Sequence, residues 1–241
     1  MKIAPMKVDL VDHMGTDLTV VNAARVSFDK TSDWVDAFGQ AAVDFDSKQF
    51  QVFLSDADTK LIHYLAKHNH WSPFAHTSIQ LRIKAPIFVA RQLVKHQVGG
   101  VWNEVSRRYV DSEPEFFFPE VWRGRPTDGM KQGSSGIVER LEADLDVTPS
   151  DEARKACFEA YCAYTNLLEA GVAPEQARMI LPQNMMTEWY WTGSLMFFAR
   201  VCKERLAPGA QAETSEVARQ IADIVRPLFP ASWAALTEPS R

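Results

Sequence analysis

Residues 78–97 read SIQLRIKAPIFVARQLVKHQ, and this stretch decides the fold. From Ser78 to Ala85 apolar residues alternate with polar ones, which predicts a strand with one buried face. Pro86 follows at a position that suits the first turn of a helix, and helical spacing of apolar residues continues as far as Gln97. The stretch therefore predicts a strand that passes directly into a helix.

The other patterns along the chain predict a helix-rich protein of the α+β or α/β class. A weak alternation at residues 7–11 indicates a further strand. Apolar residues at three- and four-residue steps predict helices over residues 17–25, 58–67, 157–168, 174–181 and 217–228. Residues 111–136 carry several prolines, glycines and serines, so we expect a long loop excursion there within a single domain that spans residues 1–241.

The composition is that of an ordinary globular protein, with 46% hydrophobic residues and a formal charge of −5. This acidic balance gives no general attraction to nucleic acid or anionic membranes, so a phosphate site must be a local basic cluster. The N-terminal residues lack the apolar run of a signal peptide, and no stretch is long and apolar enough for a membrane span. We expect a cytoplasmic protein with no membrane partner.

The cysteines are Cys157, Cys162 and Cys202. Their number is odd and the first two share one apolar helical pattern, so free thiols are expected rather than a disulfide framework. Four histidines lie between residues 63 and 76, but no cysteine or carboxylate completes a zinc set, and we predict no metal. Within that group, His68 is expected to be structural and His70 to face a ligand.

Two polar runs stand out, at residues 91–97 and 103–109. On a helix, Gln92, Lys95 and His96 would form one polar face that suits a flat, phosphate-bearing ligand.

The second run offers Ser106 together with Arg107 and Arg108, whose guanidinium groups match phosphate oxygens. Glu104 supplies an acceptor for a sugar or a base. A charged helix end that only complements its own dipole is the alternative interpretation.

The order of residues in these runs resembles the signature of the flavin-dependent thymidylate synthases. That signature is Arg-His-Arg, two free positions, Ser, one free position, Asn-Glu, one free position, Ser, one free position, Arg-Tyr. The matching residues are His96, Asn103, Glu104, Ser106, Arg108 and Tyr109. The departures are Lys95 and Gln97 at the two arginines, Gly100 at the first serine, and one extra residue between His96 and Asn103.

The resemblance extends over most of the chain outside residues 30–57 and 111–150. It includes residues 24–28, 68–76, 86–92 and 177–182, and Arg205 six residues before Gln211. Gly209 stands where the family commonly has a histidine. The resemblance implies the family's fold, a helix-rich α+β domain with a central, mainly antiparallel sheet.

The resemblance also implies the chemistry, which is reductive methylation of dUMP to dTMP. The implied carbon donor is methylenetetrahydrofolate, and the implied hydride donor is FAD reduced by NADPH, because side chains cannot supply a hydride. No cysteine nucleophile is implied. Four subunits form the sites at their interfaces in this family, so a homotetramer is expected.

The resemblance also implies which residues form the site, from their positions in the chain. Arg205 is the implied catalytic residue, since a permanently charged guanidinium can stabilise an anionic uracil ring. The implied dUMP-binding residues are Gln92, Lys95, Glu104, Ser106, Arg107, Arg108, Arg178 and Arg205. The implied FAD-binding residues are Ser27, Ser72, Lys95, His96, Gln97, Glu104, Ser194 and Arg200. His70 and Tyr109 fall on the folate or NADPH side.

Two other functions stay open at this point. One is a nucleic-acid-binding module with a basic aromatic platform formed by Lys95, Trp102, Arg107, Arg108 and Tyr109. The other is a flavoprotein of the same fold that no longer methylates. Segments rich in methionine and aromatic residues, such as 185–186 and 189–191, are expected in either the core or a subunit interface.

Overall fold

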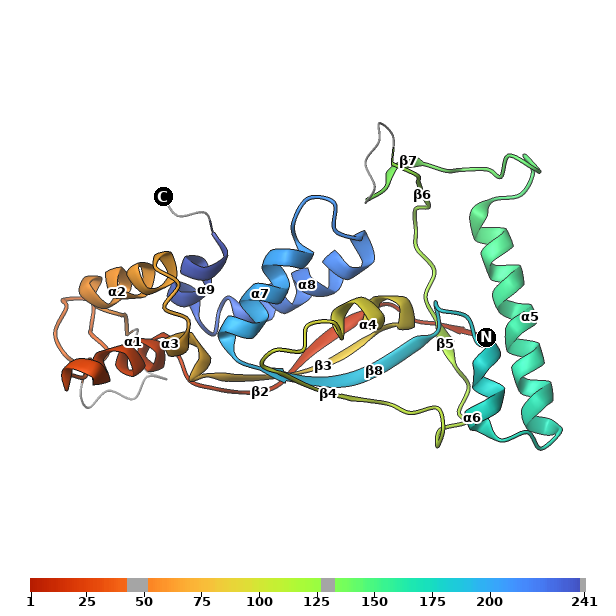
Figure 1. Ribbon diagram of the computed structural model, residues 1–241. Helices are drawn as coiled ribbons and strands as arrows, with labels where there is room; N and C mark the ends of the chain where they lie inside the picture. The colour runs from red at the N-terminus through yellow and green to blue at the C-terminus, as the bar shows by residue number, and fades with distance from the viewer. Residues whose placement is uncertain (43–51, 127–132, 239–241) are drawn as a thin grey trace.

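The computed structural model describes residues 1–42, 52–126 and 133–238. At its centre lies a four-stranded antiparallel sheet (Figure 1). Its strands, in spatial order, are β2 (Lys7–Met14), β3 (Ser78–Pro86), β8 (Met186–Gly193) and β4 (Gly100–Glu104). The mixed α and β class and the antiparallel sheet predicted for this chain are confirmed.

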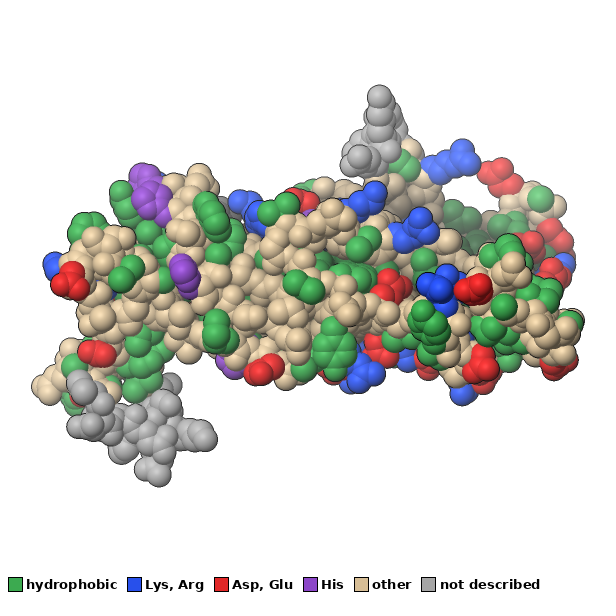
Figure 2. All heavy atoms as spheres, turned by 60° about the horizontal axis from the view of Figure 1, so that its bottom comes forward, with side chains coloured by type: hydrophobic (Ala, Val, Ile, Leu, Met, Phe, Trp, Pro, Cys, Tyr) green, Lys and Arg blue, Asp and Glu red, His purple; other side chains and the backbone are tan. Residues whose placement is uncertain are grey.

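Within the described residues, helices cover one face of this sheet (Figure 1). They are α4 (Ile87–Leu93), α7 (Leu195–Arg205) and α8 (Ala212–Val225). The opposite face comes forward in Figure 2 and bears charged side chains of both signs among hydrophobic ones. The Arg82–Glu188 ion pair at 2.6 Å belongs to it, as does Tyr190, which is 43% exposed.

The remaining elements lie toward the two ends of the sheet (Figure 1). One end carries α1 (Asp17–Arg25), a 3-10 turn (Val26–Phe28), α2 (Asp56–Lys67), α3 (Ser72–Ala75) and α9 (Pro230–Thr237). The other end carries α5 (Pro149–Glu169), α6 (Pro174–Ala177), a 3-10 turn (Arg178–Ile180), and the short strands β1 (Lys2–Ile3), β5 (Glu115–Phe116), β6 (Arg123–Gly124) and β7 (Ser135–Ile137).

The strand predicted from residue 78 is β3, and its apolar and polar side chains point to opposite faces of the sheet, as predicted. Ile79, Leu81 and Ile83 are completely buried beneath the helices, whereas Arg82 is exposed on the other face. Apolar burial of this kind is the main stabilising contribution to folding. Because β3 pairs with both β2 and β8, its single buried face fixes the side on which the core forms.

Aromatic rings fill the space between β8 and α7. Trp191 meets the rings of Phe197 and Phe198 edge to face, with centroids 5.2 and 5.5 Å apart. Trp102 from β4 stacks on Trp189 with centroids 4.3 Å apart. Both tryptophans of β8 are buried, so this aromatic segment belongs to the core of the chain.

Several bounds of the predicted helices are wrong. Helix α5 begins at Pro149 rather than near residue 157, because Thr148 is its N-cap. The helix after Pro86 ends at Leu93 rather than near Gln97, so Lys95 and His96 lie in the turn that leads to β4. A rigid helical face formed by Gln92, Lys95 and His96 therefore does not exist. Helix α2 begins two residues earlier than expected, because Ser55 is its N-cap and accepts a hydrogen bond from the Asp58 amide at 3.1 Å.

The segment predicted as a loop excursion is anchored at its start. Strand β5 pairs in parallel with β1, and Phe116 on it is completely buried. Strands β6 and β7 form a small antiparallel ribbon. Residues 127–132 of the excursion lie outside the described residues.

All three cysteines are free thiols, as expected. No helix in the described ranges has the length and apolar character that a membrane crossing requires.

A steric prediction follows from a pair of glycines that face Phe197. Gly100 and Gly193 are register partners across β4 and β8, and a Cβ on Gly193 would overlap the Phe197 ring. We expect Gly193→Ala to lower the free energy of unfolding by about 1–3 kcal/mol, measured by urea denaturation, since the ring cannot retreat within a packed core. In a Phe197→Leu background the same change should cost much less. A neutral Gly193→Ala, or costs that simply add, would contradict the clash.

Candidate active site

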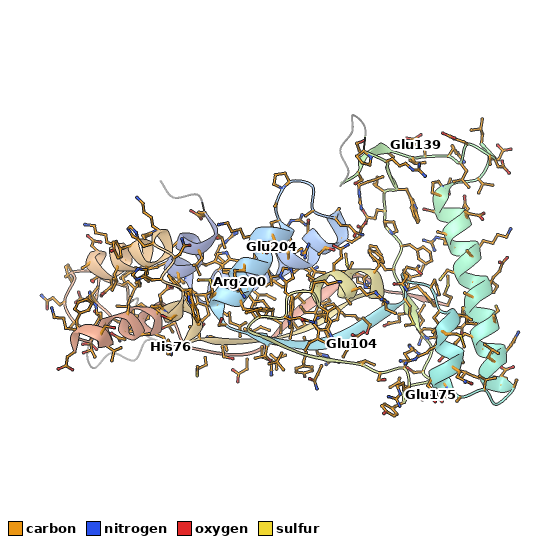
Figure 3. The ribbon with its side chains drawn as sticks, viewed as in Figure 1. His76, Glu104, Glu139, Glu175, Arg200 and Glu204 are labelled. Carbon is orange, nitrogen blue, oxygen red and sulfur yellow. The ribbon has the colours of Figure 1, made fainter. Side chains whose placement is uncertain are left out.

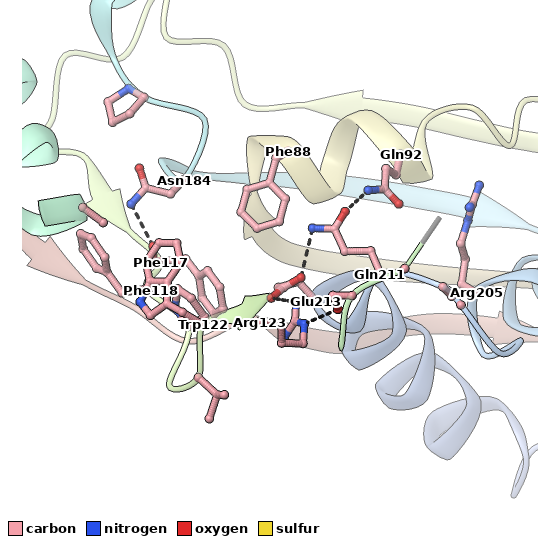
Figure 4. Close-up of a pocket in the computed structure, with 18 of the residues that line it drawn as sticks. Phe88, Gln92, Phe117, Phe118, Trp122, Arg123, Asn184, Arg205, Gln211 and Glu213 are labelled. Atoms are coloured by element: carbon pink, nitrogen blue, oxygen red, sulfur yellow. Dashed lines mark hydrogen bonds and ion pairs between the residues drawn. The ribbon is translucent and has the colours of Figure 1, made fainter. Parts of the chain in front are cut away.

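A cavity of about 1370 Å³ lies beside the sheet where α4, α8, α5 and the β6–β7 ribbon meet (Figure 4). Its wall combines aromatic rings with polar side chains. Its lining includes Phe88, Gln92, Phe117, Arg123, Cys157, Asn184, Arg205, Gln211 and Glu213. Two of the substrate residues predicted from the sequence, Gln92 and Arg205, are among them.

A continuous chain of hydrogen bonds crosses this cavity wall (Figure 4). Arg123 of β6 donates to one oxygen of Glu213 at 2.5 Å, and Gln211 donates through Nε2 to the other oxygen at 3.0 Å. The carbonyl oxygen of Gln211 accepts from Nε2 of Gln92, and the carbonyl oxygen of Gln92 accepts from the Thr214 hydroxyl at 3.1 Å. The ribbon, the first turn of α8 and α4 are thus joined by polar contacts.

Arg205, at the end of α7, is held by an imidazole. Its Nε donates to Nε2 of His96 at 3.0 Å, and its carbonyl oxygen accepts from the Ser215 hydroxyl at 2.6 Å. Nε2 of His96 must carry a lone pair to accept this bond, so the ring proton resides on Nδ1. The contact therefore requires a neutral His96.

The surroundings of His96 favour that neutral form. The side chain is 11% exposed, and its burial, followed by the positive charge of Arg205, lowers the pKa of His96 below the ordinary 6.5. Arg200 reinforces the shift, whereas the carboxylate of Glu204, 3.9 Å away, opposes it.

A second cavity, of about 550 Å³, lies on the other side of α7, against α2 and α9. Its floor is apolar, with Phe74 and Met196, and its rim carries Lys67, Arg200 and Lys203. His70, predicted to face a ligand, lines it together with Trp71. His68 instead packs its ring on Tyr64 with centroids 4.3 Å apart.

The second half of the signature lies elsewhere. In Figure 3, Arg200 and Glu204 stand on the helical side of the sheet, whereas Glu104 and Glu175 lie toward its other side. Arg108 pairs with the Glu175 carboxylate at 3.5 Å, and Arg178 donates to the Glu175 carbonyl oxygen at 3.3 Å. Arg108 and Arg178 thus both contact Glu175, but among the described residues neither lines the cavity that holds Gln92 and Arg205.

The remaining predicted site residues are placed as follows. Glu104 accepts from the Thr187 hydroxyl at 2.7 Å, and Ser106 accepts from the Arg108 amide at 3.3 Å. Arg107 donates to the Ser112 carbonyl oxygen at 2.6 Å. Ser194 caps α7, and Arg200 donates to the Val98 carbonyl oxygen. Exposed positions are Ser27, Ser72, Lys95, Gln97 and Tyr109.

Sequence patterns missed several residues of the first cavity. Arg123 and Glu213 pair across 90 positions of the chain, and Cys157 meets Asn184 across 27. No local period connects such partners, so only the fold reveals them. Among the described residues, no group of three or more histidine, cysteine or acidic side chains is arranged to hold a metal ion.

Comparisons with known proteins point to one family. The family profile described as "Thymidylate synthase complementing protein" matches residues 9–231. A flavin-dependent thymidylate synthase of Thermus thermophilus is 41% identical over 231 residues, which are 96% of this chain and 75% of that protein. The enzyme of that name from Kosmotoga olearia is 35% identical over 226 residues, 94% of this chain and 87% of that protein.

A solved structure is also similar. The UMP/dUMP methylase PolB from Streptomyces cacaoi, crystallised with 5-Br dUMP, superposes with a TM-score of 0.77 at 28% identity. The match covers 98% of this chain and 97% of that one.

The buried His96 predicts a pH dependence of stability. Because folding lowers the pKa of His96, the unfolded chain binds a proton more readily, and this contribution to stability is lost as pH falls below about 6.5. Between about pH 8 and about pH 5.5, urea unfolding should show a larger loss for the wild type than for His96→Gln, which is neutral throughout. Equal losses, or an NMR-measured pKa of His96 at or above its ordinary value, would argue against the assigned contact.

Proposed function

This chain belongs to the thymidylate synthase complementing protein family, and from that premise we propose that it is a flavin-dependent thymidylate synthase that methylates dUMP to dTMP. The observation that carries the proposal is the cavity in which Gln92 and Arg205 lie together. We place the uracil ring there. Its amide-like edge needs donors and acceptors, and the two side chains provide both.

Arg205 is the proposed catalytic residue. Its guanidinium stays charged at every physiological pH, so it stabilises negative charge on the uracil ring without exchanging a proton. The neutral imidazole of His96 holds this group in place through the 3.0 Å hydrogen bond. Such prior orientation lowers the reorganisation that the reaction would otherwise require.

We place the flavin in the second cavity. A flat, largely apolar ring suits the floor at Phe74 and Met196, and the cations Arg200 and Lys203 suit the phosphates of FAD. His70 and Trp71 stand at its edge. When bound, a reduced flavin supplies the hydride that no side chain can provide. We propose NADPH as the reductant and methylenetetrahydrofolate as the carbon donor, in line with the sequence resemblance.

We assign the phosphate of dUMP to Arg108 and Arg178, which both contact Glu175. Since one chain keeps these residues apart from Gln92 and Arg205, we propose that two subunits of a homotetramer form each site. Side chains from one subunit would hold the ring, and those from another would hold the phosphate. A single domain over residues 1–241 and a cytoplasmic location stay predictions.

Nucleic-acid binding through the basic aromatic platform has less support. The Trp102 ring stacks on Trp189, and its indole N–H donates to Glu104 at 3.2 Å. Arg108 is paired with Glu175. Base stacking needs free aromatic faces, and the ring of Trp102 already has one face covered.

A cysteine nucleophile is the chemical alternative, and Cys157 is the thiol to consider because it lines the cavity. Burial raises the pKa of Cys157, and burial raises the pKa of Cys202 to about 12, so neither supplies a thiolate at neutral pH.

The purified enzyme with FAD, NADPH, methylenetetrahydrofolate and dUMP should therefore form dTMP, and Cys157→Ala should keep that activity. Absence of dTMP in the wild type would refute the function. Its loss only in a folded, dUMP-binding Cys157→Ala would restore a thiol mechanism.

Complementation between subunits tests the proposed division of the site. Arg205→Ala and Arg108→Ala should each abolish most turnover when present in every subunit. In mixed oligomers refolded from equal amounts of the two variants, about a quarter of the sites combine two intact halves, so activity should return to roughly that level. Arg219→Ala, an exposed residue of α8, is the control and should stay active alone. No recovery in mixed oligomers would place both arginines in one subunit's site.

A further inference from the structure

The polar chain in the first cavity contains two amide side chains whose direction matters. An amide offers N–H donors at one end and a carbonyl acceptor at the other, and the two ends have nearly the same shape. Gln92 and Gln211 both line the cavity. Each still has one N–H and one lone pair free after its partners in the chain are counted.

One partner fixes both directions. An ionised carboxylate only accepts hydrogen bonds, so the end of Gln211 that meets Glu213 must be its NH₂ group. The carbonyl oxygen of Gln211 then faces Gln92, so the NH₂ group of Gln92 must donate to it. The hydroxyl of Thr214 cannot set this order, because a hydroxyl either donates or accepts.

The surroundings of Glu213 favour its ionised form. Although its side chain is 9% exposed and burial alone would raise its pKa, the hydrogen bonds from Arg123 and Gln211 lower the pKa of Glu213 overall. Its place in the first turn of α8 adds a favourable dipole. Arg123 is itself oriented by a 3.0 Å hydrogen bond to the Ser134 hydroxyl.

We propose that Glu213, with Arg123, is a positioning residue that makes this site select a uracil ring over a cytosine ring, by locking the amides of Gln92 and Gln211 in one direction. The proposal rests on the proposed function, which places the pyrimidine beside Gln92. Uracil presents an N3–H donor and an O4 acceptor, whereas cytosine presents an N3 acceptor and an amino donor. An amide pair locked one way matches the first edge, and a reversed pair matches the second.

The test is the ratio of dissociation constants for dUMP and dCMP, measured by calorimetry on the FAD-loaded enzyme. Glu213→Gln removes the acceptor-only group and lets both amides turn. We expect it to weaken dUMP binding and to reduce the preference for dUMP over dCMP by about tenfold or more, the effect of one mismatched hydrogen-bonding pair in a buried site. Glu213→Asp keeps an acceptor-only group and should retain most of the preference.

The matched control is Glu216→Gln, one turn further along α8, where the carboxylate is 43% exposed and pairs with Arg219. It should leave the ratio unchanged. If Glu213→Gln does not fold because Arg123 loses its partner, the Arg123→Gln/Glu213→Gln double variant, which removes both charges, is measured instead.

The outcomes separate the two proposals. A wild type that binds no dUMP overturns the proposed function. A wild type that prefers dUMP, with a folded Glu213→Gln that weakens both nucleotides equally, overturns the positioning role, because a merely structural residue lowers affinity without changing the ratio.

Discussion

The packing of Phe197 against two paired glycines constrains much of this molecule. Gly100 and Gly193 face each other across β4 and β8, and the Phe197 ring occupies the space where their side chains would be. A ring that is 2% exposed and wedged in this way sets the height and the rotation of α7 above the sheet. Every functional side chain on α7 inherits its position from that contact.

The rotation of α7 divides its residues between two cavities. Met196, Arg200 and Lys203 lie at four- and three-residue steps and face the smaller cavity, whereas Glu204 and Arg205 face the larger one. A helix with its side chains is about 10 Å across, so ligands in the two cavities of one subunit are kept apart and a hydride cannot pass directly between them.

Strand β4 explains why the signature is split. Five extended residues from Gly100 to Glu104 span about 13 Å, since each step of a strand advances roughly 3.3 Å. His96 therefore stays with Arg205, while the residues after Glu104 are carried to α6 and Glu175. The extended strand thus separates the two halves of the signature within the described chain.

The sequence predicted those features that depend on neighbouring residues. Alternation identified β3, and spacing identified α5 and α8, because each has one buried face. It did not reveal β8, because the aromatic run Trp189–Tyr190–Trp191 hides the alternation of a strand with one open face. It did not reveal α7 either, because most side chains of its first turns are buried. The Arg123–Glu213 pair could not be predicted from the sequence for another reason, because partners 90 residues apart share no local pattern.

Some departures from the family pattern have a structural explanation and others have none. At Gly100 any side chain would strike the Phe197 ring, so the family's serine does not fit this packing. Gly209 has φ of +84°, a conformation that strains a histidine but not a glycine, so the turn after α7 favours glycine at this position. Nothing in the structure explains Lys95 and Gln97. The explained changes lie in backbone and packing, and the hydrogen bond between His96 and Arg205 forms with these residues in place.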